Sequence, residues 1–234
     1  MKQEIQEITQ ADLQAALRQN SPSRPTAELS DAQILRAKLR FMEIAREVCP
    51  GYELDEEQKP VILDVFNWCM RLPGKYDHDK GLWIWGSIGS GKSTLLQIVN
   101  KFCYEVRPDE PIGYRGHELP FCIRIRRAID ICDAYAEKGI AGLHEIINIE
   151  RLGIDDIGTE NRITGHYTNS ANVIGDLLLR RYDMRDRFQT HVTTNLSPQQ
   201  ISEVYGERIY DRCGEMFNFV HLDGYTHRPE INTL

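Results

Sequence analysis

A glycine-rich phosphate-loop pattern constrains the fold of this chain more than any other feature. The segment Gly86-Ser87-Ile88-Gly89-Ser90-Gly91-Lys92-Ser93 fits G-x-x-x-x-G-K-[ST], with an apolar run at 81–85 before it and an amphipathic run at 93–103 after it. Its glycines let the backbone curl so that N–H groups point inward at phosphate oxygens, and the next helix directs its positive N-terminus at the same charge. The pattern therefore predicts a strand, a phosphate-binding loop and a helix, in that order.

This loop predicts a nucleotide and Mg²⁺ as ligands. Lys92 can reach the β- and γ-phosphates, and the Ser93 hydroxyl can ligate Mg²⁺. The alternative is a Gly/Ser-rich turn that matches by accident, and the strand and helix on either side argue against it. The residues expected to contact the nucleotide are Gly86, Ser87, Gly89, Ser90, Gly91, Lys92, Ser93 and Thr94.

Apolar segments alternate with amphipathic ones along the rest of the main domain, which we place at 55–234. Strands separated by helices indicate a parallel sheet with helices on both faces, so we predict an α/β fold with a five-stranded parallel sheet. Strands are expected at 81–85, 121–125, 152–154, 189–193 and 217–222. Helices are expected at 60–70, 93–103, 173–182 and after residue 127.

Residues 1–54 are predicted to form a short helical appendage. Two capping boxes, at 9–12 and at 30–33, each open a helix, and the proline-containing segment 20–25 separates them. The second helix carries apolar residues at three- and four-residue steps. These helices either pack on the main domain or dock a partner, and both interpretations remain open.

Two adjacent carboxylates follow the predicted strand 152–154. Asp155 can hold Mg²⁺ through its water shell, and Asp156 can orient or deprotonate an attacking water. A solvated loop after a strand is the alternative interpretation. Downstream of a phosphate loop, the pair predicts hydrolysis of the bound nucleotide, and not binding alone; for an ATPase this is ATP to ADP and phosphate.

Polar residues near the C-terminus could complete such a site. Parallel strands end at one edge of the sheet, so Asn195 could bond the γ-phosphate or the lytic water, or it could cap the next helix. Arg208 and Arg212 lie four residues apart and would share one helix face. They could pair with Glu207 or Asp211, or stabilise transition-state charge on a neighbouring subunit.

Taken together, these segments resemble the DnaC/IstB-like AAA+ ATPases. These are bacterial and phage helicase loaders, together with ATP-binding helper proteins of insertion sequences. The resemblance covers roughly 55–228 and rests on 86–94, Ile154-Asp155-Asp156-Ile157-Gly158, Thr193-Thr194-Asn195-Leu196 and Gly206-Glu207-Arg208-Ile209-Tyr210-Asp211-Arg212.

The resemblance implies an AAA+ P-loop NTPase fold and further roles for individual residues. Asn195 would be sensor I, and Arg212 would be the arginine finger that acts on the next subunit. Arg208 would be a second interface arginine, and Arg228 falls where loaders carry a late sensor-type arginine. The expected catalytic residues are then Lys92, Asp156, Asn195 and Arg212.

The chain departs from the family pattern in three places. Asp156 stands where many AAA+ enzymes have glutamate, and the shorter side chain predicts slow, switch-like turnover. Residues 1–54 match no helicase-docking sequence and contain no metal-ligand cluster. The segment 109–120 is a longer link to the second strand than a minimal core requires.

A net charge of −7 excludes a DNA binder that depends on global positive charge. DNA contact would need a local cluster: Arg124, Arg126 and Arg127, expected at the end of the second strand, could face the channel of a ring or spiral. A second basic group, interpreted equally as solvated surface, comprises Arg180, Arg181, Arg185 and Arg187.

Three observations favour a cytoplasmic protein with no membrane partner. No apolar stretch reaches the length of a membrane span, and the N-terminus leads into no signal-like segment. The six cysteines form no Cys-x-x-Cys pair, which is typical of reduced thiols.

The leading hypothesis is an ATP-dependent assembly factor that forms a homo-oligomeric ring or spiral with ATP. Its cargo would be a replicative helicase placed on single-stranded DNA during replication. The alternative within this fold is an IstB-like helper that assembles on double-stranded DNA and recruits a transposase. A small P-loop kinase is the alternative of another class, although it would not need Asn195 or the two arginines of 206–212. A nucleotide-binding module without hydrolysis is also possible, although the adjacent carboxylates argue against it.

Overall fold

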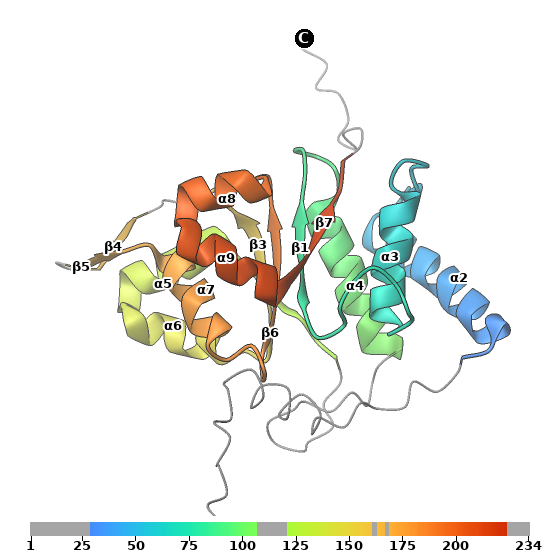
Figure 1. The fold of residues 1–234 in the computed structure, drawn as a ribbon, viewed down its shortest axis with the longest axis horizontal. Coiled ribbons are helices and arrows are strands. Elements are labelled where there is room, and N and C mark those ends of the chain that lie inside the picture. The colour runs from blue at the N-terminus through green and yellow to red at the C-terminus, as the bar shows by residue number, and fades with distance from the viewer. Residues whose placement is uncertain (1–28, 107–120, 161–162, 167–168, 224–234) are drawn as a thin grey trace, which may run out of the picture.

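A five-stranded parallel sheet forms the centre of the computed structural model, which describes residues 29–106, 121–160, 163–166 and 169–223 (Figure 1). The strand order is β2-β3-β6-β1-β7, and every neighbouring pair is parallel. The sheet strands are β1 (Gly81–Trp85), β2 (Arg124–Arg127), β3 (Arg151–Ile157), β6 (Gln189–Thr194) and β7 (Phe217–His221). A separate antiparallel hairpin contains β4 (Thr164–His166) and β5 (Asn169–Ala171). The α/β fold and five-stranded parallel sheet predicted from the sequence are therefore confirmed.

Helices cover both faces of this sheet, as Figure 1 shows. One layer contains α2 (Asp31–Val48), α3 (Lys59–Cys69) and α4 (Lys92–Val106). The other contains α5 (Ala128–Lys138), α6 (Ile140–Ile147), α7 (Val173–Tyr182), α8 (Pro198–Tyr205) and α9 (Glu207–Met216). Successive side chains of a strand point to opposite faces of the sheet. Leu82 and Ile84 of β1 therefore pack in the core under α2, α3 and α4, whereas Trp83 packs in the core under α5 to α9.

Helix α2 packs against α4, the helix that follows the phosphate loop. Ser30 caps α2 in the predicted capping box, and the Phe41 ring packs edge-on against Phe102 of α4 at 5.1 Å. Ionic contacts add to this packing, since the Arg40 guanidinium donates two hydrogen bonds, of 2.8 and 2.9 Å, to the carboxylate of Glu105. The first capping box, at 9–12, lies outside the described residues, as does the segment 109–120.

The second strand begins later than the sequence predicts, at Arg124 and not at Phe121. The Asn100 side chain of α4 bonds both backbone groups of Ile123, at 2.6 and 3.0 Å, so a side chain takes the place of a strand partner there. Phe121 and Ile123 are buried in the core before the strand starts. The arginines expected at the end of this strand, Arg124, Arg126 and Arg127, therefore all lie within an edge strand.

The third strand is longer than the predicted segment 152–154, and it includes both carboxylates. Its pairing with β6 is irregular between Ile154 and Ile157, so Asp155 and Asp156 occupy the interruption in the register. Helix α6 and the hairpin β4–β5 were not predicted. Each is short, and α6 follows α5 after a single residue, Gly139, with φ +59°.

Two further features of the described residues are the composition of the helices and the state of the cysteines. Among the residues that the structure describes, no helix combines the length and the apolar composition needed to cross a bilayer. None of the six cysteines, all of them within the described residues, forms a disulfide, and Cys122 is the exposed one. Burial raises the pKa of Cys213 to about 12, so this thiol behaves as an apolar core residue.

Candidate nucleotide-binding site

The phosphate loop connects β1 to α4 through three glycines with positive φ. The φ angles of Gly86, Gly89 and Gly91 are +150°, +85° and +90°, a region that residues with a Cβ rarely adopt. At Gly86 a Cβ would also lie 2.1 Å from the carbonyl oxygen of Leu222, the residue that follows β7. The backbone therefore curls as the sequence predicts, and β7 confines its first residue.

Two polar side chains of the loop are buried. Lys92 Nζ donates a 2.6 Å hydrogen bond to the carbonyl oxygen of Ser87, across the loop. The Ser90 hydroxyl is buried and bonds no described residue. A phosphate oxygen is a stronger acceptor for an ammonium group than a neutral carbonyl, so the loop fits an oxyanion.

The metal-ligating pair predicted from the sequence is in hydrogen-bond contact. Ser93 Oγ donates to Asp155 Oδ1 at 2.7 Å, so a hydroxyl from α4 meets a carboxylate from β3. Oxygen ligands of this kind are what Mg²⁺ prefers, and it commonly takes one or two carboxylates together with substrate phosphates and water. The residues present therefore fit Mg²⁺ bound beside a phosphate chain.

Thr193 connects the two carboxylates, and the sequence analysis did not identify it as a site residue. Its hydroxyl donates to Asp155 Oδ1 and accepts a 2.9 Å hydrogen bond from the backbone N–H of Asp156. Asp156 has φ +58°, a left-handed conformation that is uncommon outside glycine. The hydroxyl of β6 thus orients the Asp155 carboxylate and supports the strained backbone that presents Asp156.

Asn195 lies beside the phosphate loop at the end of β6. It lines a cavity of about 400 Å³ together with Gly86, Ser87 and Ile88 of the loop. The alternative role as a helix cap belongs to Ser197, whose hydroxyl accepts from the backbone N–H of Gln200. The Asn195 amide is exposed and lines the same cavity as the start of the loop.

Two rings that the sequence did not indicate line this cavity as well. Trp85 and His221 stack at 3.9 Å between centroids, and His221 Nε2 lies 3.1 Å from a carboxylate oxygen of Asp223. They come from the ends of β1 and β7, which are neighbouring strands. Only this strand pairing brings the rings together, since they are far apart in the sequence.

The structure does not bring Arg208 and Arg212 to the phosphate loop of their own chain. Both lie on α9, and neither lines the cavity at the loop. Neither forms an ion pair with a described carboxylate, so the pairing with Glu207 or Asp211 does not occur. Arg208 is exposed, and the guanidinium of Arg212 lies 4.6 Å from the centre of the Tyr182 ring. Arg228 lies outside the described residues.

The first basic group is exposed at the edge of the sheet. Arg124, Arg126 and Arg127 are all exposed on β2, which is a terminal strand of the sheet. Arg127 donates to both carboxylate oxygens of Asp130, at 2.6 and 2.9 Å, so its charge is compensated. Arg124 and Arg126 form no ion pair with a described carboxylate.

Solvated surface was one of two interpretations of the second basic group, and for Arg181 that interpretation is wrong. Its side chain is fully buried, and burial lowers the pKa of the guanidinium to about 9. The guanidinium donates to the carbonyl oxygens of Ile147, Ile149 and Gln189 at 2.8–2.9 Å and to the Thr190 hydroxyl at 2.7 Å. These hydrogen bonds connect α7 to the segment before β3 and to β6.

The segment before α3 contacts the phosphate loop from the other side. Gln58 is buried, and its amide donates to the carbonyl oxygens of Asp223, at 2.9 Å, and of Ser90, at 3.4 Å.

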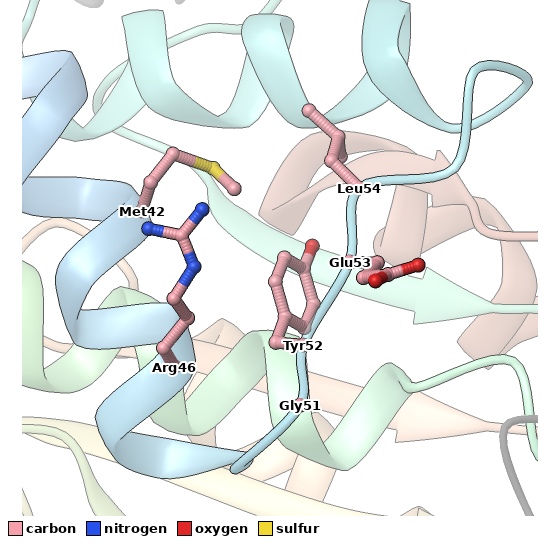
Figure 2. Close-up of a pocket in the computed structure, with 6 residues that line it drawn as sticks. All are labelled: Met42, Arg46, Gly51, Tyr52, Glu53 and Leu54. Atoms are coloured by element: carbon pink, nitrogen blue, oxygen red, sulfur yellow. The ribbon is translucent and has the colours of Figure 1, made fainter.

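A separate cavity of about 430 Å³ lies between α2 and the segment that leads to α3. Figure 2 shows its lining: Met42, Arg46, Gly51, Tyr52, Glu53 and Leu54. It contains no residue of the phosphate loop.

The fold and this loop define a P-loop NTPase fold of the AAA+ type. The structure is similar to that of DnaI, with a TM-score of 0.55 and 22% sequence identity over 78% of this chain and 93% of that chain. It is similar to the DnaC helicase loader with a TM-score of 0.55 and 18% identity over 79% of this chain and 99% of that chain. It is also similar to domain III of the replication initiation protein DnaA from Thermotoga maritima, with a TM-score of 0.53 and 19% identity over 77% of this chain and 67% of that chain. The predicted likeness to DnaC-type AAA+ proteins is confirmed, and at these identities it concerns the fold. No protein-family model matches the sequence, and no curated protein matches it either.

Proposed function

We propose that this protein binds and hydrolyses ATP as an AAA+ assembly factor, and that its cargo is a replicative helicase. One observation carries the proposal: side chains from α4, β3 and β6 meet behind the phosphate loop, where Asp155 bonds both Ser93 and Thr193. These groups are far apart in the sequence. Their contact supports a metal-assisted site for phosphoryl transfer over a Gly/Ser-rich turn that matches the loop pattern by accident.

In the proposed mechanism, residues of this chain bind and orient the nucleotide. Lys92 leaves the Ser87 carbonyl for the β- and γ-phosphate oxygens, and the loop N–H groups donate to the same phosphates. Ser93 and Asp155 would hold Mg²⁺, which would offset phosphate charge there. The smaller Asp156 side chain, in place of the glutamate of many AAA+ enzymes, fits slow turnover.

Hydrolysis requires a positioned water and stabilisation of charge on the phosphate. The Asp156 carboxylate orients the water and accepts its proton as the oxygen attacks the γ-phosphorus and the bond to the β–γ bridging oxygen breaks. The Asn195 amide donates to the γ-phosphate or to the water. Arg212 reaches the γ-phosphate of a neighbouring copy, which accords with its position away from its own loop.

A head-to-tail ring or spiral follows from an arginine that acts between copies. Arg124 and Arg126, exposed and without a described carboxylate partner, would then contact the phosphates of single-stranded DNA. The likeness to a structure named a helicase loader supports a helicase as partner. We assign docking to residues 1–54, where α2 exposes Leu35 and Leu39 on the face away from α4.

The test uses the purified full chain with ATP and with the replicative helicase of the same cell. We expect saturable ATP binding, slow release of phosphate, and ATP-dependent deposition of the helicase on single-stranded DNA. The Asp156→Asn variant should hold the ATP-bound complex, and Lys92→Ala should form none. Deposition of a transposase on double-stranded DNA in place of the helicase would favour the insertion-sequence alternative. Transfer of phosphate to a small acceptor would identify a kinase.

A further inference from the structure

Arg212 is held by an aromatic ring and not by a carboxylate. Its guanidinium carbon lies 4.6 Å from the centroid of Tyr182, the last residue of α7. Among the described residues, no carboxylate lies within ion-pair distance of Arg212. Arg185 differs: it lies 4.1 Å from the same ring and also forms a 3.2 Å ion pair with Glu215. One arginine at this ring is therefore neutralised, and the other is not.

The ring itself is fixed in place by α9. Its hydroxyl donates a 3.1 Å hydrogen bond to the Glu215 carboxylate, which also pairs with Arg185. Glu215 lies on α9 one turn beyond Arg212, so the helix that carries the arginine also holds the ring beneath it. Desolvation and this hydrogen bond raise the pKa of Tyr182, so the phenol stays neutral.

A ring and a carboxylate hold an arginine with different consequences. A carboxylate takes up the N–H donors in a bidentate bond and neutralises the charge, so an incoming phosphate must displace it. The face of an aromatic ring attracts the cation through its quadrupole and leaves the N–H donors at the edge of the guanidinium plane available. Such an arginine is preorganised for an oxyanion that comes from outside its own chain.

We propose that Tyr182 is a positioning residue for Arg212, which it holds at the surface with its charge uncompensated, ready for the γ-phosphate of ATP in a neighbouring copy. This inference rests on the proposed function, since it takes Arg212 as the residue that acts between copies. Tyr182 touches no substrate and acts only through Arg212. The ion pair of Arg185 with Glu215 keeps the second arginine from this role and fixes the ring.

The first experiment measures steady-state ATP hydrolysis by the full chain. Tyr182→Leu removes the ring, and we expect kcat to fall about tenfold while KM for ATP changes by less than about twofold. Tyr182→Phe keeps the ring and loses the hydroxyl, and kcat should fall no more than about threefold. The matched control is Tyr104→Leu, the same change at an exposed tyrosine of α4, which should leave both constants unchanged.

The second experiment separates positioning from packing and remains informative if Tyr182→Leu does not fold. Phenylalanine analogues with an increasing number of ring fluorines replace Tyr182, because fluorine weakens the quadrupole with little change of shape. We expect log kcat to fall steadily with fluorination at constant melting temperature. In the Arg212→Ala background the same series should change kcat by less than about twofold, since both residues act through one interaction.

The outcomes distinguish this inference from the function on which it rests. If a heavily fluorinated ring leaves kcat unchanged while Arg212→Ala lowers kcat about 10³-fold, Tyr182 has no positioning role and the proposed function stands. If fluorination lowers kcat equally in the Arg212→Ala background, Tyr182 acts on something other than Arg212. If Arg212→Ala keeps full kcat, or if the full chain hydrolyses no ATP, the proposed function fails and this inference fails with it.

Discussion

The charged side chains at the phosphate loop and those on the outer face of α9 differ in their partners. Around the loop, two charged site residues bond groups of their own chain: Lys92 bonds Ser87, and Asp155 bonds Ser93 and Thr193. On α9, Arg212 rests on a ring, and it forms no ion pair with any carboxylate that the structure describes.

This difference separates a site that one chain completes from a surface that awaits another molecule. Groups bonded within the chain are held in position before a ligand arrives, so binding a nucleotide needs exchange of partners and little rearrangement. A cation without a carboxylate partner keeps its attraction for an external anion. We therefore expect substitutions at the loop to change ATP binding and substitutions on α9 to change hydrolysis alone.

The largest effect is expected at Arg212. Because this residue lies away from the loop of its own chain, Arg212→Ala should keep ATP affinity while kcat falls about 10³-fold, as is typical for loss of an arginine finger. Mixing this variant with Asp156→Asn chains, which retain Arg212, should restore activity. Absence of recovery at every mixing ratio would contradict the assignment of the two regions to different copies.

Arg181 tests the opposite case, a cation that serves only its own chain. Arg181→Ala leaves three carbonyls and a hydroxyl without their donor, so the free energy of unfolding should fall by about 3 kcal/mol or more. Urea denaturation measures this loss. The matched control is Arg180→Ala at the exposed neighbour, where we expect about 0.5 kcal/mol or less. Equal values for the two variants would contradict a structural role for Arg181.

Lys92 tests the loop itself. Lys92→Ala removes the ammonium group, and we expect the Kd for ATP to rise at least about 100-fold, measured by calorimetric titration. Lys101→Ala, on the same helix but paired with Glu47 at the surface, serves as control and should bind ATP normally. Retained affinity in the Lys92 variant would exclude the loop as the phosphate site.

The smallest effect is expected at Thr193. Thr193→Val keeps the shape and removes the hydroxyl that orients Asp155, and kcat should fall about tenfold, as with other residues that orient metal ligands. The control is Thr194→Val, since the partners of the Thr194 hydroxyl among the described residues are backbone groups, those of Ile157 and Leu196. If both variants lose activity equally, the effect belongs to the packing of β6 and not to Asp155.

Local pattern predicted most of the elements within a few residues. Strand 81–85 and helix 173–182 match β1 and α7, because a run of apolar residues or a 3.6-residue period is written in the local sequence. The second strand was misplaced because the Asn100 side chain, 23 residues away, replaces its ladder bonds at Ile123. Such a substitution of one partner for another leaves no periodic signal.

By itself, the sequence determined the phosphate-loop pattern and most of the succession of strands and helices, and it predicted Lys92, Ser93, Asp155 and Asn195 as site residues, because their spacing along the chain carries the pattern. Only the tertiary structure decided which other side chains join them. Thr193 reaches Asp155 through the irregular register of β3 against β6, Arg181 turns inward to three carbonyls, and Tyr182 meets Arg212 where α7 packs on α9. These contacts depend on register and helix packing, which arise from the whole core and not from any local run of residues.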